Sequence, residues 1–231
     1  MKILGLDTSS DACSVAVFDT STSKLIAEES VPLQRGHAEL LFSQITRVMS
    51  AAGTELDMVG RFAVTTGPGT FTGVRIGLAA ARGLALAAGR PLIGVGSLEV
   101  IAATADTTSR AVVVAAIDAR RGELYVQGFL AGRAITEAFA APADEAAARL
   151  TQAAPSGCSF EALGTGASAI VAALGASGHS SKPLGGDPFP QASALVRLAA
   201  QRPIPLERPQ PLYLRAPDAK LPAAQTIPGG A

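Results

Sequence analysis

An order of elements in the first half of the chain returns in the second half, and this repeat constrains the fold more than any other feature. Residues 111–130, "AVVVAAIDARRGELYVQGFL", have the pattern strand, aspartate, tight turn, strand, as do residues 2–19. Residues 160–175, "FEALGTGASAIVAALG", have the pattern strand, glycine turn, helix, as do residues 61–88. Self-similarity of this kind indicates an internal duplication and predicts an α/β protein of two related lobes.

The remaining elements follow from apolar periodicity and from glycine and proline punctuation. The first three strands are separated only by short polar turns, so we expect an antiparallel meander. Strands are predicted at 2–9, 12–19, 24–31, 61–66 and 91–97, and helices at 37–52, 70–88, 98–105 and 191–202.

The polar stretch "DTTSR" at 106–110 is the predicted boundary between the lobes. This boundary gives a first lobe at 1–105 and a second lobe at 106–215. Residues 216–231 have little apolar surface to bury, and we expect a flexible tail there.

Charge and apolar content limit the class of partner. The chain has 19 basic and 19 acidic residues, without the basic excess typical of proteins that grip nucleic acid alone. We therefore expect any contact with RNA to be indirect. No signal segment follows Met1, and the most apolar helix carries Arg75 and Arg82, so we predict a cytoplasmic protein without a membrane span.

The stretch "GPGTFTGVRIG" at 67–77 allows two interpretations. Glycines permit close backbone approach and a helix start offers free amides, so the loop could bind a phosphate. The polar residues Asp7 and Thr8 at the end of the first strand could take part in such a site. The loop matches neither GxxxxGK[ST] nor GxGxxG with an acidic residue in the expected place. Asp7 could instead simply accept hydrogen bonds from the amides of the turn that follows the first strand. The candidate nucleotide or phosphate contacts are Asp7, Thr8, Gly67, Pro68, Gly69 and Thr70.

Small residues on the helix that follows this loop favour helix packing over phosphate binding. Gly73, Gly77, Ala80, Ala81 and Gly83 would let a second helix approach closely. That helix could be the one at 37–52 or a helix of another chain.

The sequence gives little support for metal binding or for nucleophilic catalysis. The two histidines, His37 and His179, are far apart, and the two cysteines, Cys13 and Cys158, have no metal-ligand spacing. The sequence lacks a nucleophile-elbow motif. We therefore predict no metal site and no catalytic residues.

Five segments together resemble the bacterial TsaB (YeaZ-like) family of tRNA threonylcarbamoyladenosine biosynthesis subunits. They are "ILGLDTSSDACSVAV", "GPGTFTGVRIGLAAARGLALA", "IGVGSLE", "AAIDARRGELY" and "PLYLR", and the match covers roughly residues 2–215. The resemblance implies a duplicated actin-like (ASKHA, ribonuclease H-like) fold of two lobes.

The resemblance also implies a role as a non-catalytic scaffold. TsaB-like chains pair with a catalytic sister, TsaD, which transfers threonylcarbamoyl to adenosine 37 of ANN-decoding tRNAs, and a small ATPase, TsaE, completes the assembly. The sister's HxxxH metal motif would fall near Ser97 and Ile101 here, and neither residue is a histidine.

The family pairs its subunits through first-lobe helices, which correspond to 37–52 and 70–88. The implied partner interface consists of His37, Leu40, Leu41, Gln44, Ile45, Val48, Met49, Val74, Gly77, Ala80, Ala81 and Leu84. The same surface could form a homodimer when the partner is absent. No cofactor is expected beyond a weak ATP or ADP contact at that interface.

Two other functions stay open at this point. One is a free-standing actin-like ATPase or kinase, which would depend on Asp7. The other is a glycoprotease-like metalloprotein, which would require a bound metal.

Overall fold

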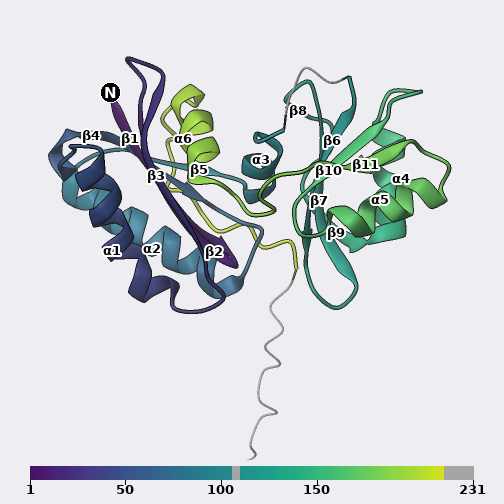
Figure 1. Cartoon of the computed structure of the whole chain (residues 1–231), viewed down its shortest axis with the longest axis horizontal. Helices are drawn as coiled ribbons and strands as arrows, with labels where there is room; N and C mark the ends of the chain where they lie inside the picture. Colours follow the sequence, from purple (N-terminus) through teal and green to yellow (C-terminus); the bar gives the residue numbers. More distant parts are fainter. Residues whose placement is uncertain (106–109, 216–231) are drawn as a thin grey trace, which may run out of the picture.

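The computed structural model describes residues 1–105 and 110–215, and it contains two lobes, each built on one β-sheet (Figure 1). The sheet of the first lobe has the strand order β3-β2-β1-β4-β5. Its strands are β1 (Lys2–Ser10), β2 (Ala12–Asp19), β3 (Lys24–Pro32), β4 (Val59–Thr65) and β5 (Leu92–Val95). The first three form the predicted antiparallel meander, whereas β1, β4 and β5 are parallel neighbours.

Two helices cover one face of this sheet, and local sequence sets their ends. The helix α1 (His37–Ala51) follows Gly36, which has a positive φ of 88°, and the helix α2 (Phe71–Ala88) follows Thr70. The Thr70 side chain accepts a hydrogen bond from the Gly73 amide, as an N-cap residue does. The apolar faces of both helices and of the sheet form one core cluster.

The second lobe repeats this plan. Its sheet has the order β11-β10-β6-β7-β8, with β9 also paired to β7. Its strands are β6 (Val112–Asp118), β7 (Glu123–Leu130), β8 (Arg133–Ala134), β9 (Phe139–Pro142), β10 (Phe160–Leu163) and β11 (Ser181–Pro183), and its helices are α4 (Ala143–Ala153) and α5 (Ala167–Ala176). The predicted strand pair and strand–glycine–helix unit are present, but β8, β9, β11 and α4 were not predicted.

The last helix of each half packs on the inner face of a sheet, and the two helices are exchanged between lobes. The helix α3 (Ser97–Ala102) packs against β6 and β7 of the second sheet, and α6 (Ala192–Gln201) packs against β1 and β2 of the first. Figure 1 shows both helices between the two sheets. The predicted assignment of residues 106–215 to the second lobe therefore needs a correction, because α6 belongs to the core of the first.

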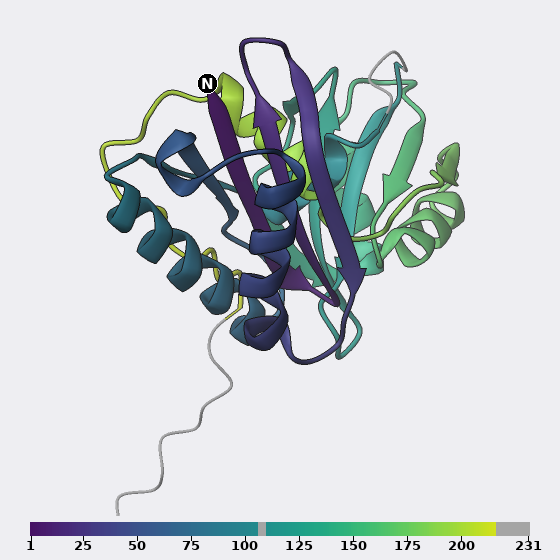
Figure 2. The same ribbon diagram turned by 60° about the vertical axis from the view of Figure 1, so that its left-hand side comes forward.

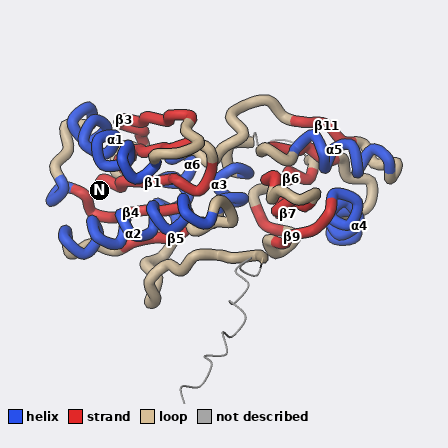
Figure 3. The backbone as a smooth tube through the Cα atoms, turned by 90° about the horizontal axis from the view of Figure 1, so that it is seen from below, coloured by secondary structure: helices blue, strands red, loops and turns tan. Residues whose placement is uncertain are grey.

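After α6, residues 202–215 run back along the first lobe (Figures 2 and 3). We call this segment the strap. Arg82 donates to the Pro209 carbonyl at 2.5 Å, and the Leu212 amide donates to the Thr66 carbonyl at 2.8 Å. The strap thus lies beside α2 and the β4–β5 edge. Residues 106–109 of the predicted boundary and the predicted tail at 216–231 lie outside the described residues.

One described helix, α2, is long and apolar enough to cross a membrane when judged by length and composition alone. In the structure this helix packs on β1 and β4 and contributes to the first-lobe core.

Candidate functional site

Asp7 lies near the end of β1 and is completely buried. Its Oδ1 atom accepts hydrogen bonds from the Ser9 hydroxyl at 2.6 Å, the Ser9 amide at 3.2 Å and the Thr65 hydroxyl at 2.5 Å. Its Oδ2 atom has no hydrogen-bond partner among the described residues. Burial raises the pKa of the Asp7 carboxyl to about 6, because desolvation disfavours the charged form more than these hydrogen bonds favour it.

The hydrogen bonds around Asp7 extend into the neighbouring elements. The Ser97 hydroxyl donates to the Ser9 hydroxyl at 3.0 Å, and the Ser97 amide donates to the Gly67 carbonyl at 2.8 Å. Ser97 is buried at the start of α3. By the family resemblance, the HxxxH motif of the catalytic sister would fall near this position, where the serine of this chain joins β1 to the glycine loop.

The glycine loop at 67–70 packs directly on the end of β1. A Cβ atom at Gly69 would lie 2.1 Å from the Ser9 carbonyl oxygen, and one at Gly73 would lie 2.0 Å from the Thr8 carbonyl oxygen. The Thr70 amide donates to the Ser9 carbonyl at 2.8 Å, and the Thr8 hydroxyl donates to the Gly73 carbonyl at 2.7 Å. The glycines are therefore required because the loop contacts the protein's own backbone.

This packing divides the six predicted nucleotide or phosphate contacts. Asp7, Thr8, Gly67 and Pro68 are buried, and none of the four lines the cavity between the lobes. Gly69 and Thr70 line a cavity between the lobes. A ligand contact at these two residues stays a prediction.

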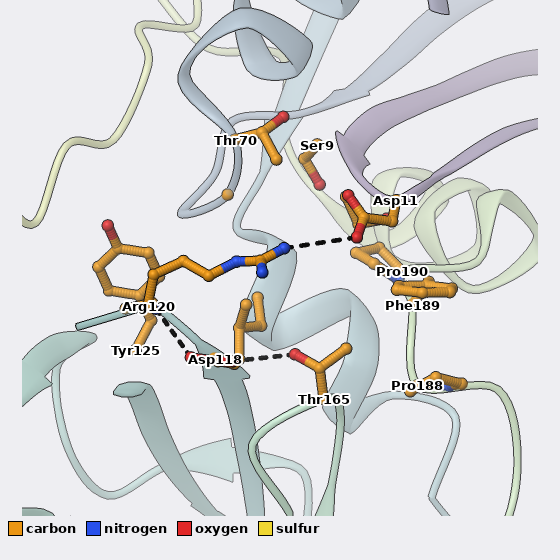
Figure 4. Close-up of a pocket in the computed structure, with 14 residues that line it drawn as sticks. Ser9, Asp11, Thr70, Asp118, Arg120, Tyr125, Thr165, Pro188, Phe189 and Pro190 are labelled. Atoms are coloured by element: carbon orange, nitrogen blue, oxygen red, sulfur yellow. Dashed lines mark hydrogen bonds and ion pairs between the residues drawn. The ribbon is translucent and has the colours of Figure 1, made fainter. Parts of the chain in front are cut away.

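The cavity has a volume of about 250 Å³ and lies where both lobes meet the segment before α6 (Figure 4). The first lobe contributes the strand end and the glycine loop, and the second contributes the β6–β7 turn. The lining residues are Ser9, Ser10, Asp11, Gly69, Thr70, Ile117, Asp118, Ala119, Arg120, Tyr125, Thr165, Pro188, Phe189 and Pro190.

Polar contacts at the second-lobe side hold the turn in place. The Asp118 carboxylate accepts a bond from the Arg120 amide at 2.8 Å, and the Asp118 amide donates to the Thr165 hydroxyl at 2.9 Å. The Arg120 guanidinium lies 3.7 Å from the Asp11 carboxylate, so one ion pair spans the two lobes (Figure 4). The cavity thus combines hydroxyls and the Arg120 guanidinium with the carboxylates of Asp11 and Asp118.

The sequence analysis noted the aspartate of the 111–130 repeat, which is Asp118, without assigning it a role, and it missed Phe189 and Pro190. No local signal marks these last two residues. They join the cavity only because α6 returns to the first lobe and carries the preceding segment across the cleft.

Most residues of the predicted partner interface face the protein's own core, which corrects that prediction. They pack on the sheet because the apolar side of each helix is the side that the monomer buries. His37, Leu41, Gln44, Ile45, Val48, Val74, Gly77, Ala80 and Ala81 are buried. The Gln44 amide group, for example, donates to the carbonyls of Cys13 and Glu29 at 3.0 and 2.9 Å.

Three predicted interface residues, Leu40, Met49 and Leu84, are partly exposed. The side of α2 that points away from the sheet carries a stripe at steps of three and four residues, which consists of Ile76, Ala79 and Gly83. Ala79 and Gly83 are exposed, and no atom lies within 4 Å of a Cβ built at Gly83. We call this stripe of three residues the outer helix face.

The histidines and cysteines have structural surroundings. The His37 ring bonds the Ser10 carbonyl at 2.9 Å, and the His179 ring packs edge-on against Phe160. Burial raises the pKa of the Cys13 thiol to about 12. Within residues 1–105 and 110–215, no three His, Cys, Asp or Glu side chains are grouped as metal ligands.

The comparisons with known proteins agree with this architecture. Component A of (R)-2-hydroxyglutaryl-CoA dehydratase from Acidaminococcus fermentans shares the fold, with a TM-score of 0.52 at 11% identity over 87% of this chain and 96% of that one. A Pseudomonas aeruginosa crystal structure, described as an uncharacterized protein with similarity to peptidase YEAZ, has a TM-score of 0.75 at 29% identity. That match covers 93% of this chain and 99% of the other.

In sequence, the tRNA threonylcarbamoyladenosine biosynthesis protein TsaB of Escherichia coli K12 is 41% identical over 126 residues, which are 54% of this chain and 53% of that protein. The chain thus matches about half the length of the curated relatives. The family model of TsaD, tRNA N6-adenosine threonylcarbamoyltransferase, matches residues 30–180.

Two lobes with the same order of strands and helices, and a cavity between them, define a duplicated actin-like α/β protein. The chain belongs to the family described by the TsaD model, and the predicted resemblance to its TsaB (YeaZ-like) members is confirmed.

Proposed function

We propose that this protein is a non-catalytic scaffold in the synthesis of threonylcarbamoyladenosine at position 37 of ANN-decoding tRNAs. In this role it pairs with a TsaD-like catalytic subunit in the cytoplasm, a TsaE-like ATPase joins the pair, and tRNA binds through the partners. The observation that carries the proposal is the 41% identity to TsaB of Escherichia coli.

The burial of Asp7 supports a scaffold rather than an enzyme. The carboxyl group is buried under the glycine loop and bonded to the protein's own hydroxyls, so it cannot reach a substrate in the cavity. A catalytic acid or base must lie within hydrogen-bond reach of the reacting group.

The outer helix face is the surface that we assign to the catalytic subunit. Ala79 and Gly83 leave room for a partner helix to approach closely, and the partly exposed Ile76 adds apolar area on the same side of α2. The buried residues Leu41 and Ala80 are poor test positions, because an arginine there would disrupt the monomer itself.

Co-purification with a TsaD-like subunit tests the proposal. Ala79→Arg places a charged side chain on the outer helix face, and we expect it to abolish co-purification while the isolated chain stays folded. Ala51→Arg, at an exposed position at the end of α1, is the matched control and should retain the partner. Equal retention by both variants would contradict the assigned face.

The cavity between the lobes favours a second candidate, a free-standing ATPase or kinase of the actin-like superfamily, because it places hydroxyls and Arg120 together. Calorimetric titration of the isolated protein with ATP and Mg²⁺ separates the two functions. The scaffold predicts weak heat and no hydrolysis, whereas strong saturable binding with turnover would support the second candidate.

A further inference from the structure

The cavity between the lobes carries charges of both signs on facing walls. Asp11 lies in the turn between β1 and β2 of the first lobe, and Arg120 lies in the turn between β6 and β7 of the second (Figure 4). Asp118, the last residue of β6, adds a second carboxylate. Among the described residues that line the cavity, these three are the charged ones, so the walls carry two negative charges and one positive charge.

The ion pair between Asp11 and Arg120 leaves both groups able to bind a third one. The guanidinium nitrogen lies 3.7 Å from the carboxylate oxygen, whereas opposite charges joined by a hydrogen bond are about 2.7–2.9 Å apart. The side chains of Asp11 and Arg120 are 33% and 78% exposed, so each can turn toward a ligand. Neither forms a second ion pair within residues 1–105 and 110–215.

Hydroxyl groups in the cavity also have hydrogen-bonding capacity to spare. The Ser10 hydroxyl oxygen is buried and has no partner in the described part of the chain. The hydroxyls of Thr70 and Thr165 each accept a bond from a backbone amide and keep their own hydrogen to donate. A buried hydroxyl without a partner in the chain indicates a partner from outside it, and a polar ligand can supply one.

The size of the cavity limits the ligand. Its volume of about 250 Å³ is below the range of about 300–1,000 Å³ that is typical of pockets for drug-sized ligands. A nucleoside triphosphate would therefore fit only if the lobes moved apart. Ile117, Phe189 and Pro190 form apolar parts of the wall, and charge contacts are stronger beside such walls than in water.

The two signs of charge select the chemical class of the ligand. A simple anion would pair with Arg120 but would lie close to two carboxylates, and a simple cation would lie close to the guanidinium. A zwitterion avoids both conflicts, because its carboxylate can bind the guanidinium through two hydrogen bonds while its ammonium group faces Asp11 and Asp118.

We propose that the cavity between the lobes binds a small zwitterion of the α-amino acid class. The ligand carboxylate pairs with Arg120, and the ligand ammonium group pairs with Asp11 and Asp118. A short polar side chain on the ligand accepts hydrogen bonds from the hydroxyls of Thr70 and Thr165. This site goes beyond the scaffold role and does not depend on it.

Three probes that differ only in charge test this site by NMR titration of the ¹⁵N-labelled full chain. L-serine carries both charges, ethanolamine keeps only the ammonium group, and 3-hydroxypropionate keeps only the carboxylate. We expect saturable shifts of the amides of residues 9–11 and 117–120 with L-serine, and an affinity at least about tenfold higher than for either other probe. No saturable shift across the millimolar range, or equal affinity for ethanolamine, would overturn the proposal.

Two neighbouring arginines give a matched pair of variants. Arg120→Gln removes the guanidinium from the cavity and should weaken L-serine binding at least about tenfold, without weakening the binding of ethanolamine. Arg121 does not line the cavity, and its φ of 58° is close to the 63° of Arg120, so Arg121→Gln carries the same backbone strain and should bind L-serine as the wild type does. Equal affinities of the two variants would contradict the assigned role of Arg120.

A variant on the first-lobe wall tests the other charge. Asp11→Asn should weaken the binding of both L-serine and ethanolamine, whereas 3-hydroxypropionate should bind no more weakly. The amide spectrum of each variant shows directly whether the chain remains folded. A loss of affinity for all three probes in a folded Asp11→Asn chain would overturn the charge assignment.

Two further titrations separate this site from the proposed functions. Ala79→Arg on the outer helix face should leave L-serine binding unchanged even if it releases a TsaD-like partner, so the scaffold role and the ligand site can fail independently. ATP with Mg²⁺ should not displace L-serine. Displacement with saturable shifts at the same amides would assign the cavity to a nucleotide and overturn the proposal.

Discussion

In the first lobe the amide of Thr70 donates to the Ser9 carbonyl at 2.8 Å, and in the second the amide of Gly166 donates to the Ala116 carbonyl at 2.9 Å. Each bond joins a glycine loop to the first strand of its half. In both lobes a glycine lies against that strand: a Cβ would be 2.1 Å from the Ser9 oxygen at Gly69 and 2.3 Å from the Ala116 oxygen at Gly164.

The polar groups at these two strand ends differ. Asp7 is enclosed between the glycine loop and α3, whereas Asp118 is exposed and bonds the amide of Arg120 in its own turn. The helix α2 also has an N-cap side chain, that of Thr70, whereas α5 has no side-chain cap. The duplicated halves therefore share the backbone contact that their fold requires, while their side chains have separate roles.

Alanine at the two contact glycines should have the largest effect. Gly69→Ala and Gly164→Ala each force a Cβ into a backbone oxygen, and Gly164 also has a φ of +97°, so we expect a loss of about 3 kcal/mol or more for each. Urea unfolding measures this loss. Gly83→Ala, where nothing lies within 4 Å, is the control and should gain about 0.5–1 kcal/mol, because alanine favours the helix. A small loss at only one of the two sites would break the equivalence of the lobes.

The next largest effect should be the pH dependence of stability that Asp7 causes and Asp118 does not. The folded pKa of about 6 lies above the unfolded value of 3.8, so the folded protein binds the proton more tightly. The contribution of Asp7 to stability is therefore greatest below pH 4 and falls as the pH rises to about 6. Because each pKa unit corresponds to about 1.4 kcal/mol, the loss is up to about 3 kcal/mol.

The variant Asp7→Asn removes that titration, so the stability of the wild type relative to this variant should fall between pH 4 and pH 7. Denaturant unfolding at several pH values measures the difference. Asp118→Asn, at the corresponding exposed position, should change stability by only about 0.5 kcal/mol at pH 7. If the difference in unfolding free energy between the wild type and Asp7→Asn does not change with pH, the burial of an ionisable Asp7 is contradicted.

Loss of the ion pair between the exchanged helices should have an intermediate effect. Arg202, which follows α6, binds both carboxylate oxygens of Glu99 in α3 and donates to the Gly94 carbonyl at 2.7 Å. Both side chains are about two thirds buried, so Glu99→Gln should cost about 1–2 kcal/mol. The melting temperature measured with and without high salt provides the check.

The exposed pair on α4 supplies the smallest effect. Arg149 and Glu145 are one helical turn apart, and the Arg149 guanidinium lies 2.5 Å from the Glu145 carboxylate. Half of each side chain is exposed. Glu145→Gln should cost only about 0.3–0.5 kcal/mol. A cost equal to that of Glu99→Gln would show that the Glu99–Arg202 pair contributes no more than an ordinary surface pair.

Much of the fold could be predicted from local pattern. The three meander strands, the helices α1 and α2 and the repeat around Asp118 were found within a few residues of their ends, because alternation, apolar periodicity and glycine stops are local signals. The helix α4 was missed because its apolar positions are alanines, with Leu150 as the one large apolar residue, and β8 and β11 are too short for a period to be read.

The candidate site could be predicted only in part. The glycine loop and Asp7 were identified, but burial excluded Asp7 from the cavity, and Phe189 entered it without any signal in the sequence. For α1 and α2, the apolar positions were correct, yet periodicity cannot say whether an apolar face covers the protein's own sheet or another chain.

By itself the sequence determined the order of elements, their duplication and the places where glycine was necessary, because these depend on residues close together in the chain. Only the tertiary structure decided that α3 and α6 change lobes, that the loop glycines contact strand carbonyls, and that a cavity forms between the lobes. Those features join residues as far apart as Ser9 and Phe189, and such contacts arise from packing that no local pattern encodes.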